Sequence, residues 1–195
     1  MRYFMVKDNK RNMCTIGIDP SINSTGICVV DDNIVNYYIL PAKLTKRMQA
    51  FEHERIMIYP FDKQEVKGLD YESREIAHTN NIIYICNNIR SILSRHVPTM
   101  VCIEGVAYNA NGTIVELAGL NYAIRMICNE LHIPYKIVSP TSLKKFAVAN
   151  GSADKNLMIY AWNTLEPELK DIKAFKVDDL ADAYFLAQYG TQTGN

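Results

Sequence analysis

Residues 16–30 read IGIDPSINSTGICVV, with apolar residues gathered at both ends of a polar segment. The apolar run 15–19 ends in an Asp-Pro pair, and a second apolar run, 26–30, follows six residues later. Short apolar runs bounded by Pro, Asn, Ser and Gly are typical of buried β-strands joined by a turn. The pattern therefore predicts two consecutive strands, with the carboxylate of Asp19 at the end of the first.

The sequence directly after this stretch predicts a third strand, at residues 34–40, reached through the turn Asp31-Asp32-Asn33. Residues 41–70 are mixed and charged without a clear period, and we interpret them as an elaboration with one extra strand at 55–59. Isoleucines at near-helical spacing then predict a long helix at 71–96 that ends before Pro98.

The second half of the chain alternates strands and helices. Residues 100–104 (MVCIE) form a buried strand that ends in the carboxylate of Glu104, and 134–138 form a fifth strand. Helices are expected at about 113–131, 140–149, 153–163 and 178–189. This order predicts an α/β fold with a mixed five-stranded sheet flanked by helices, in a single domain spanning residues 1–195.

The composition predicts a folded cytoplasmic protein. Apolar residues make up 48% of the chain, and no apolar run approaches the roughly 18 residues needed to span a membrane. The N-terminus shows no signal-peptide pattern, so we expect a soluble intracellular protein that has no membrane partner. The five cysteines are odd in number and lack C-x-x-C spacing, which favours reduced core residues over disulfides or zinc ligands.

The charge balance disfavours one class of partner. The chain has 21 basic and 21 acidic residues, whereas proteins that bind nucleic acids usually carry a positive excess. A net charge of zero nevertheless permits a basic face, because charges can be segregated on the surface. If several carboxylates bind metal ions, the protein together with its ions has a positive net charge.

Carboxylates stand at the ends of three apolar segments. Asp19 and Glu104 end strands, and Asp178, Asp179 and Asp182 lie in the first turns of the last helix. Two carboxylates about 4 Å apart repel by roughly 4 kcal/mol at an effective dielectric constant of about 20, so such a cluster calls for a cation. Oxygen ligands without His or Cys suit Mg²⁺ or Mn²⁺. Singly, each Asp is more simply explained as a turn residue or a helix N-cap, whereas Glu104 follows three apolar residues, where an unpaired charge is costly.

Four segments in order resemble the RuvC family of Holliday-junction resolvases, which have the RNase H-like fold. They are residues 16–30, CIEGVA at 102–107, YKIVSPTSLKK at 135–145 followed by GSADK at 151–155, and DDLADA at 178–183. The first segment alone is weakly specific, but the ordered set, spread over about 15–187, is strongly specific.

The resemblance implies a crossover junction endodeoxyribonuclease that hydrolyses phosphodiester bonds in four-way and other branched DNA as a homodimer. Asp19, Glu104, Asp179 and Asp182 match the family's catalytic, metal-binding carboxylates, with two Mg²⁺ or Mn²⁺ ions per site. Lys144 and Lys155 match its basic residues near the scissile phosphate, and Asp178 becomes a helix N-cap or a group behind the metal ligands. Small residues of helix 113–131, Ala118, Gly119 and Ala123, suit either a dimer interface or packing within the monomer.

The chain departs from the family pattern in two places. Segment 41–70 is longer than the usual connection. The bulky residue three positions after the acidic Glu is Ala107 here, and we expect the neighbouring Tyr108 either to stack on an unpaired DNA base or to be buried.

Three alternatives to a junction resolvase stay open. An actin-like or sugar-kinase-like ATPase shares the first strand and hairpin, but it needs two such domains, so we expect no nucleotide cofactor. A relative that binds DNA without cutting it would not need all four carboxylates. Another RNase H-like nuclease, which cuts flaps or RNA–DNA hybrids, is compatible with the same residues.

Overall fold

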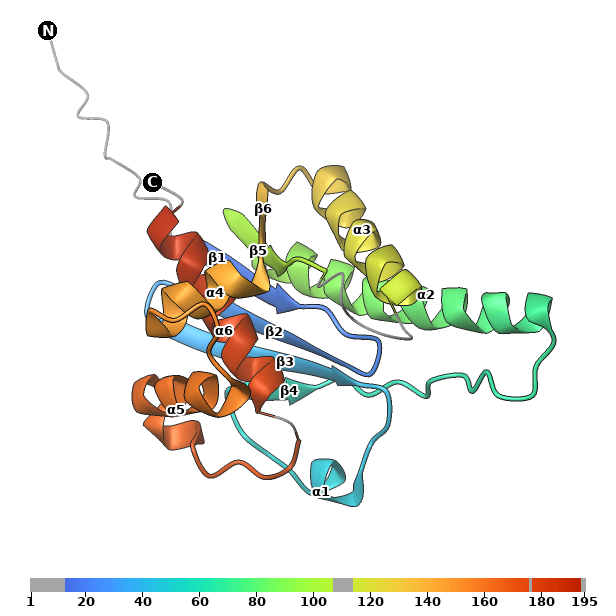
Figure 1. Cartoon of the computed structure of the whole chain (residues 1–195), viewed down its shortest axis with the longest axis horizontal. Coiled ribbons are helices and arrows are strands. Elements are labelled where there is room, and N and C mark those ends of the chain that lie inside the picture. Colours follow the sequence, from blue (N-terminus) through green and yellow to red (C-terminus); the bar gives the residue numbers. More distant parts are fainter. Residues whose placement is uncertain (1–12, 107–113, 176, 194–195) are drawn as a thin grey trace, which may run out of the picture.

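The computed structural model describes residues 13–106, 114–175 and 177–193. Its centre is a mixed sheet in which β1 (Cys14–Asp19) pairs antiparallel with β2 (Ser24–Asp31), and β2 pairs antiparallel with β3 (Ile34–Pro41). On the other side of β1 lie β5 (Met100–Glu104) and β6 (Tyr135–Val138), both parallel to it. The predicted mixed α/β architecture is therefore confirmed (Figure 1).

The sheet has six strands, one more than the expected five-stranded core, in the order β4-β3-β2-β1-β5-β6. The additional strand, β4 (Ile56–Ile58), comes from the segment that we interpret as an elaboration, and it pairs parallel with β3 to form the edge of the sheet. The same segment contains the short helix α1 (Lys46–Gln49). The elaboration thus widens the sheet at the edge farthest from β6.

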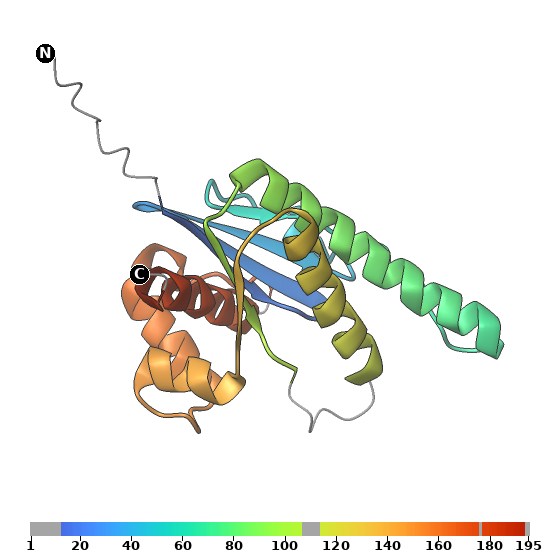
Figure 2. The ribbon, with the colours of Figure 1, turned by 90° about the horizontal axis from the view of Figure 1, so that it is seen from above.

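Helices cover both faces of the sheet (Figure 2). The long helix α2 (Tyr71–His96) and α3 (Ile114–Glu130) lie on one face. On the other face lie α4 (Pro140–Val148), α5 (Lys155–Leu165), the short 3-10 helix η1 (Pro167–Leu169) and α6 (Asp178–Thr193). None of the helices in the described parts of the chain combines the length and apolarity of a membrane-spanning segment.

Local sequence signals explain where these helices begin. Asp70, Ser139 and Asp154 each accept a hydrogen bond from a main-chain N–H of the first turn, as N-cap residues of α2, α4 and α5. Pro140 opens α4, where its missing N–H and fixed φ are favourable. These caps fix the starts of α4 and α5, the helices that carry Lys144 and Lys155.

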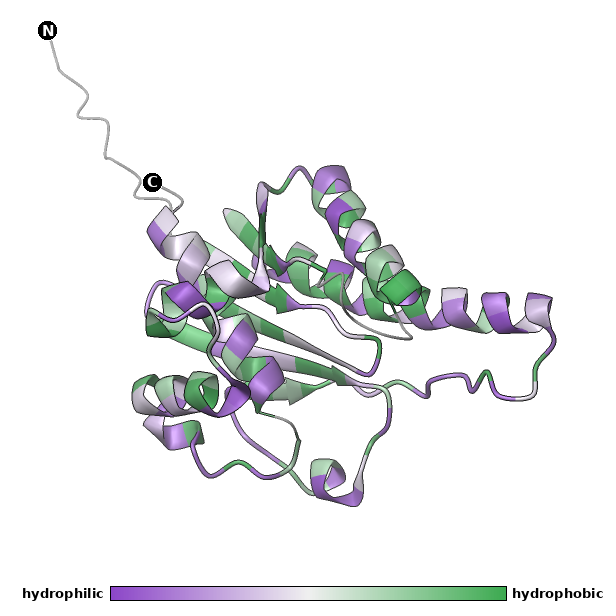
Figure 3. Ribbon diagram, viewed as in Figure 1, coloured by the Kyte–Doolittle hydropathy of each residue, from purple (hydrophilic) through white to green (hydrophobic). Residues whose placement is uncertain are grey.

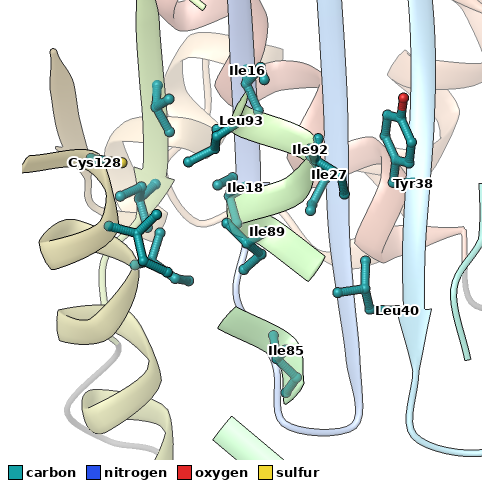
Figure 4. Close-up of a cluster of buried hydrophobic side chains, with 14 of the residues drawn as sticks. Ile16, Ile18, Ile27, Tyr38, Leu40, Ile85, Ile89, Ile92, Leu93 and Cys128 are labelled. Carbon is teal, nitrogen blue, oxygen red and sulfur yellow. The ribbon is translucent and has the colours of Figure 1, made fainter. Parts of the chain in front are cut away.

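Two hydrophobic cores lie on opposite faces of the sheet. On one face, Ile16 and Ile18 of β1 pack with Ile85 and Ile89 of α2, as Figure 4 shows. The other core lies beneath α5 and α6 and contains Trp162, whose indole N–H donates to the Tyr37 hydroxyl at 3.0 Å. Figure 3 shows that the strands between the helices of the two faces are largely apolar. It also shows the polar N-terminal part of α2, which projects beyond the sheet. All five cysteines are free thiols, and four of them are buried, as expected for reduced core residues.

Two glycines allow α6 to approach the sheet closely. A Cβ atom on Gly17 of β1 would lie 2.0 Å from the main-chain oxygen of Ala183. A Cβ atom on Gly26 of β2 would lie 2.2 Å from the main-chain oxygen of Asp179. Both distances are far inside van der Waals contact, so only glycine permits this packing. The start of α6 is thereby held directly over the ends of the central strands.

Candidate active site

The ends of β1 and β5 bring Asp19 and Glu104 together. The residues just before them, Ile18 and Ile103, are directly paired across the parallel strands. Because side chains alternate along a strand and both isoleucines face the α2 core, both carboxylates point to the α6 face. The two carboxyl groups are close enough to share a hydrogen bond.

Helix α6 adds Asp179 and Asp182 to this pair. Gly26, which lies opposite Asp19 in the β1–β2 ladder, is the residue that the backbone of Asp179 approaches. Asp182 lies three residues further along α6, so it is on the same side of the helix. Both aspartates act electrostatically on Asp19. The four carboxylates expected from the sequence are thus neighbours at one edge of the sheet.

Burial and mutual repulsion change the ionisation of this cluster. Burial, together with the charges of Glu104, Asp182 and Asp179, raises the pKa of Asp19 well above its ordinary value. Burial also raises the pKa of Glu104, while the hydrogen bond with Asp19 and the charges of Lys144 and Lys155 partly oppose this shift. Burial and the nearby carboxylates raise the pKa of Asp182 to about 7. Shifted pKa values are common at functional sites. In this cluster a bound cation would relieve the repulsion that raises the pKa values of the carboxyl groups.

Both expected lysines lie near these carboxylates. Lys155 is the first residue of α5, and its ammonium group forms an ion pair with the carboxylate of Asp178 at an N–O distance of 2.5 Å. That contact raises the pKa of Lys155, and the charges of Asp178, Asp179 and Asp182 act in the same direction. Lys144 lies within α4 and acts electrostatically on Glu104.

Asp178 has a different contact from the N-cap that we considered. It is the first residue of α6, and its carboxylate pairs with Lys155 instead of accepting from the first turn of the helix. This ion pair favours the other option that the sequence leaves open, in which Asp178 is a group behind the metal ligands. Sequence spacing misses this contact because α5 and α6 meet only in the tertiary fold.

The donor set of the cluster fits a hard divalent cation. All four side chains offer carboxylate oxygen, the ligand type that Mg²⁺ and Mn²⁺ prefer, and the buried repulsion among them favours neutralisation. Within the described ranges, no group of three or more His, Cys, Asp or Glu side chains is arranged as a metal site, so the fit lies in the type and charge of the donors.

Sequence reasoning missed one buried polar residue at the site. Asn121 of α3 is 1% exposed, and its side-chain amide donates to the main-chain oxygen of Glu104 at 2.7 Å. A lone Asn inside a helix carries no pattern that would single it out.

Gly119, considered for a dimer interface, lies beside Ile82 of α2. Tyr108, the expected stacking residue, falls outside the described residues, as does Ala107.

Comparisons with known proteins point to one family. The family model for "Crossover junction endodeoxyribonuclease RuvC" matches residues 66–188, a stretch that includes Glu104, Asp179 and Asp182 and excludes Asp19. A protein of that name from Gloeobacter violaceus is 28% identical over 123 residues, which cover 63% of this chain and 69% of the relative. Another from Orientia tsutsugamushi (strain Boryong) is 26% identical over 175 residues, covering 88% of this chain and 93% of the relative.

The fold comparison agrees with the sequence comparison. The Thermus thermophilus RuvC structure matches with a TM-score of 0.57 at 17% identity, covering 93% of this chain and 97% of that one. The structure titled "T. thermophilus RuvC in complex with Holliday junction substrate" matches with a TM-score of 0.60 at 16% identity, covering 94% and 97%. The match covers almost the whole chain, so the expected RNase H-like fold is confirmed. The family model and these likenesses together show that this chain belongs to the RuvC family of crossover junction endodeoxyribonucleases.

Proposed function

We propose that this chain is a divalent-metal-dependent endonuclease that hydrolyses phosphodiester bonds in four-way (Holliday) junctions and related branched DNA. The observation that carries the proposal is the cluster of buried carboxylates from β1, β5 and α6, with Lys155 beside it. Membership of the RuvC family supplies the substrate class. That membership gives no support to the ATPase alternative.

The metal ligands that we propose are Asp19, Glu104, Asp179 and Asp182. When bound, Mg²⁺ or Mn²⁺, two per site, would supply an activated water and stabilise the charge on the leaving oxygen. The protein's part is to hold the carboxylates on strand ends and on one side of a helix, where the main chain fixes their geometry. A protein nucleophile is not required for this reaction.

Lys144 and Lys155 are proposed to contact phosphate near the scissile bond, and Tyr108 to contact an unpaired base. Lys155 is the first residue of α5, and its ammonium group lies beside the carboxylate cluster at the start of that helix. Each lysine that neutralises a phosphate contributes about one unit to the slope of log affinity against log salt. Binding of a junction at several salt concentrations by Lys144→Ala and Lys155→Ala tests this role, and unchanged slopes would exclude it.

We further propose a single nuclease domain over residues 1–195, with 41–70 as an elaboration, that acts as a homodimer on DNA inside the cell. Two symmetric cuts in a four-way junction call for two sites related by a two-fold axis. The outer side of α3 carries Val115, Tyr122 and Met126, whose side chains are exposed and lie in one stripe at helical spacing. Sedimentation of the wild-type chain tests the assembly, and a monomer at micromolar concentration would contradict it.

The experiment that tests the substrate class compares four labelled DNAs. A four-way junction, a flap, an RNA–DNA hybrid and a plain duplex are incubated with the protein and Mg²⁺ or Mn²⁺. We expect paired cuts near the branch of the junction and little cutting of duplex. Equal cutting of duplex and junction, or cutting only of the hybrid, would overturn the proposal in favour of another RNase H-like nuclease.

A further inference from the structure

The peptide group between Glu104 and Gly105 is held from two sides. On one side, the N–H of Gly105 donates to the main-chain oxygen of Val138 in β6 at 2.8 Å. On the other, the carbonyl oxygen of Glu104 accepts from the Nδ2 atom of Asn121 at 2.7 Å. The two bonds come from different elements, a strand and a helix, so together they fix the plane of the peptide at the end of β5.

Arg125 holds the Asn121 side chain in turn. Its Nε and Nη2 atoms donate to the Oδ1 atom of Asn121 at 2.9 and 2.6 Å. A guanidinium group has only donors and a carbonyl only accepts, so the two neighbours permit a single orientation of the amide. The guanidinium also lies over the ring of Tyr122, with its carbon 4.5 Å from the ring centre. The side chain of Asn121 is therefore fixed at both ends.

We propose that Asn121 is a positioning residue for Glu104, and that Arg125 keeps the amide of Asn121 turned so that it donates to the Glu104 carbonyl. The inference rests on the proposed function, because it takes Glu104 as a metal ligand. Groups that orient metal ligands without touching the metal typically account for about 10–100-fold in metal affinity or activity. Asn121 would act in this way through the main chain of the ligand.

The most informative variant is Asn121→Asp. The side chain keeps its shape and can still pair with Arg125, but it loses the N–H that donates to Glu104. Its added negative charge would by itself attract a cation. A weaker affinity for metal in Asn121→Asp therefore cannot be attributed to charge.

A second variant and a control complete the set. Arg125→Lys keeps the positive charge but loses the pair of hydrogen bonds that the guanidinium donates to Asn121. It should therefore weaken the affinity for metal by a smaller factor than Asn121→Asp. Glu130→Gln is the matched control, because Glu130 ends the same helix and forms an exposed ion pair with Arg90 at 2.5 Å. Exposed pairs of this kind contribute little to stability, so the control should behave as wild type.

Mn²⁺ binding to the DNA-free protein, followed by electron paramagnetic resonance, is the first readout. The Mg²⁺ concentration for half-maximal single-turnover cutting of a junction is the second. For Asn121→Asp we expect a loss of about 10-fold in Mn²⁺ affinity and a matching rise in the Mg²⁺ midpoint. At saturating Mg²⁺ the cutting rate should recover toward wild type, and junction binding without metal should be unchanged.

Two kinds of result would overturn the positioning role. A lower melting temperature with unchanged metal midpoints in both variants would show that Asn121 only satisfies buried polar groups. Equal losses in the Glu130→Gln control would show that the effect does not pass through Asn121. If the wild-type chain itself binds no Mn²⁺ and cuts no branched DNA, the proposed function fails instead, so the two failures are distinguishable.

Discussion

Asp178 and Asp179 are adjacent in the sequence but differ in their surroundings. The backbone of Asp179 packs on Gly26, opposite Asp19, whereas the carboxylate of Asp178 pairs with Lys155. This difference favours Asp179 over Asp178 as the proposed metal ligand, a choice that helix spacing alone leaves open. It agrees with the register implied by the family motif, in which Asp179 is the metal ligand.

The two aspartates should therefore respond differently to the same change. Asp179→Asn should reduce single-turnover cutting by roughly 10³-fold, because the metals lose a charged ligand. Asp178→Asn should cut more slowly by a smaller factor, because Lys155 loses its ion pair but the metal ligands stay. Cutting rates at saturating Mg²⁺ measure both effects, and the reverse order would show that the register is shifted by one residue.

The raised pKa of Asp182 has a consequence for stability. Burial and the neighbouring carboxylates raise this pKa from 3.8 to about 7, so the folded state holds the proton more tightly than the unfolded state. In the metal-free protein, the contribution of Asp182 to the free energy of unfolding should therefore be greatest below about pH 4. It should be lost as the pH rises to about 7. Melting temperatures in EDTA across this range measure the effect, which Mg²⁺ should offset near neutral pH. An unaltered pH dependence in Asp182→Asn would contradict the assignment.

The candidate site was largely predictable at the level of residues that end regular elements. Asp19 and Glu104 follow apolar strands, and Asp179 and Asp182 open a helix, so their positions could be derived from pattern and motif. Asn121 could not, because its role depends on α3 crossing beside the end of β5, which no local pattern encodes.

At the scale of elements, the packing of α6 on β1 and β2 builds the site. Gly17 and Gly26 remove the side chains that would hold this helix away from the sheet. The sequence shows the glycines and the acidic helix, but only the tertiary contact shows that they depend on one another. The positions of the main strands and helices were predictable for a simpler reason, because each is a strongly periodic or apolar segment between turn residues.

Gly26→Ala tests this dependence directly. The new methyl group would meet the main chain of Asp179, which cannot move as a flexible side chain would, so a loss of about 1–3 kcal/mol or more in the free energy of unfolding is expected. Cutting should fall as well, because Asp179 is displaced. The matched control is Gly119→Ala, where a Cβ atom would lie 3.5 Å from Ile82, an ordinary contact, and should be tolerated. Urea denaturation of both variants is the measurement, and equal stability of the two would contradict the account.

The elaboration at 41–70 was the element that the sequence described least well. The sequence predicts an extra strand at 55–59, and the structure has β4 there. The sequence does not predict that this segment contacts the end of α5 and η1. Arg55, just before β4, forms an ion pair with the buried Glu166 at 2.6 Å and donates to the carbonyl oxygen of Val35 at 2.9 Å. Residues 111 positions apart in the chain meet here, a separation that sequence patterns do not resolve.

At the scale of the whole molecule, the charge composition pointed away from the function that we propose. The chain has 21 basic and 21 acidic residues, and these totals do not say where in the structure the charges lie. Several of the carboxylates are gathered and buried at the site, where a metal ion would neutralise them, and Lys144 and Lys155 stand beside them. The arrangement of charge, and not its sum, is what matters for a phosphate-binding site.

We propose that the four clustered carboxylates, of which Asp19, Glu104 and Asp182 are three, hydrolyse branched DNA with the help of divalent cations. The most direct test is single-turnover cutting of a four-way junction in Mg²⁺ by the wild-type chain and by Asp19→Asn, Glu104→Gln and Asp182→Asn. We predict paired cuts by the wild type, losses of roughly 10³-fold or more in each variant, and junction binding that is retained in all of them. Near-normal cutting by any one of the three variants would contradict the account.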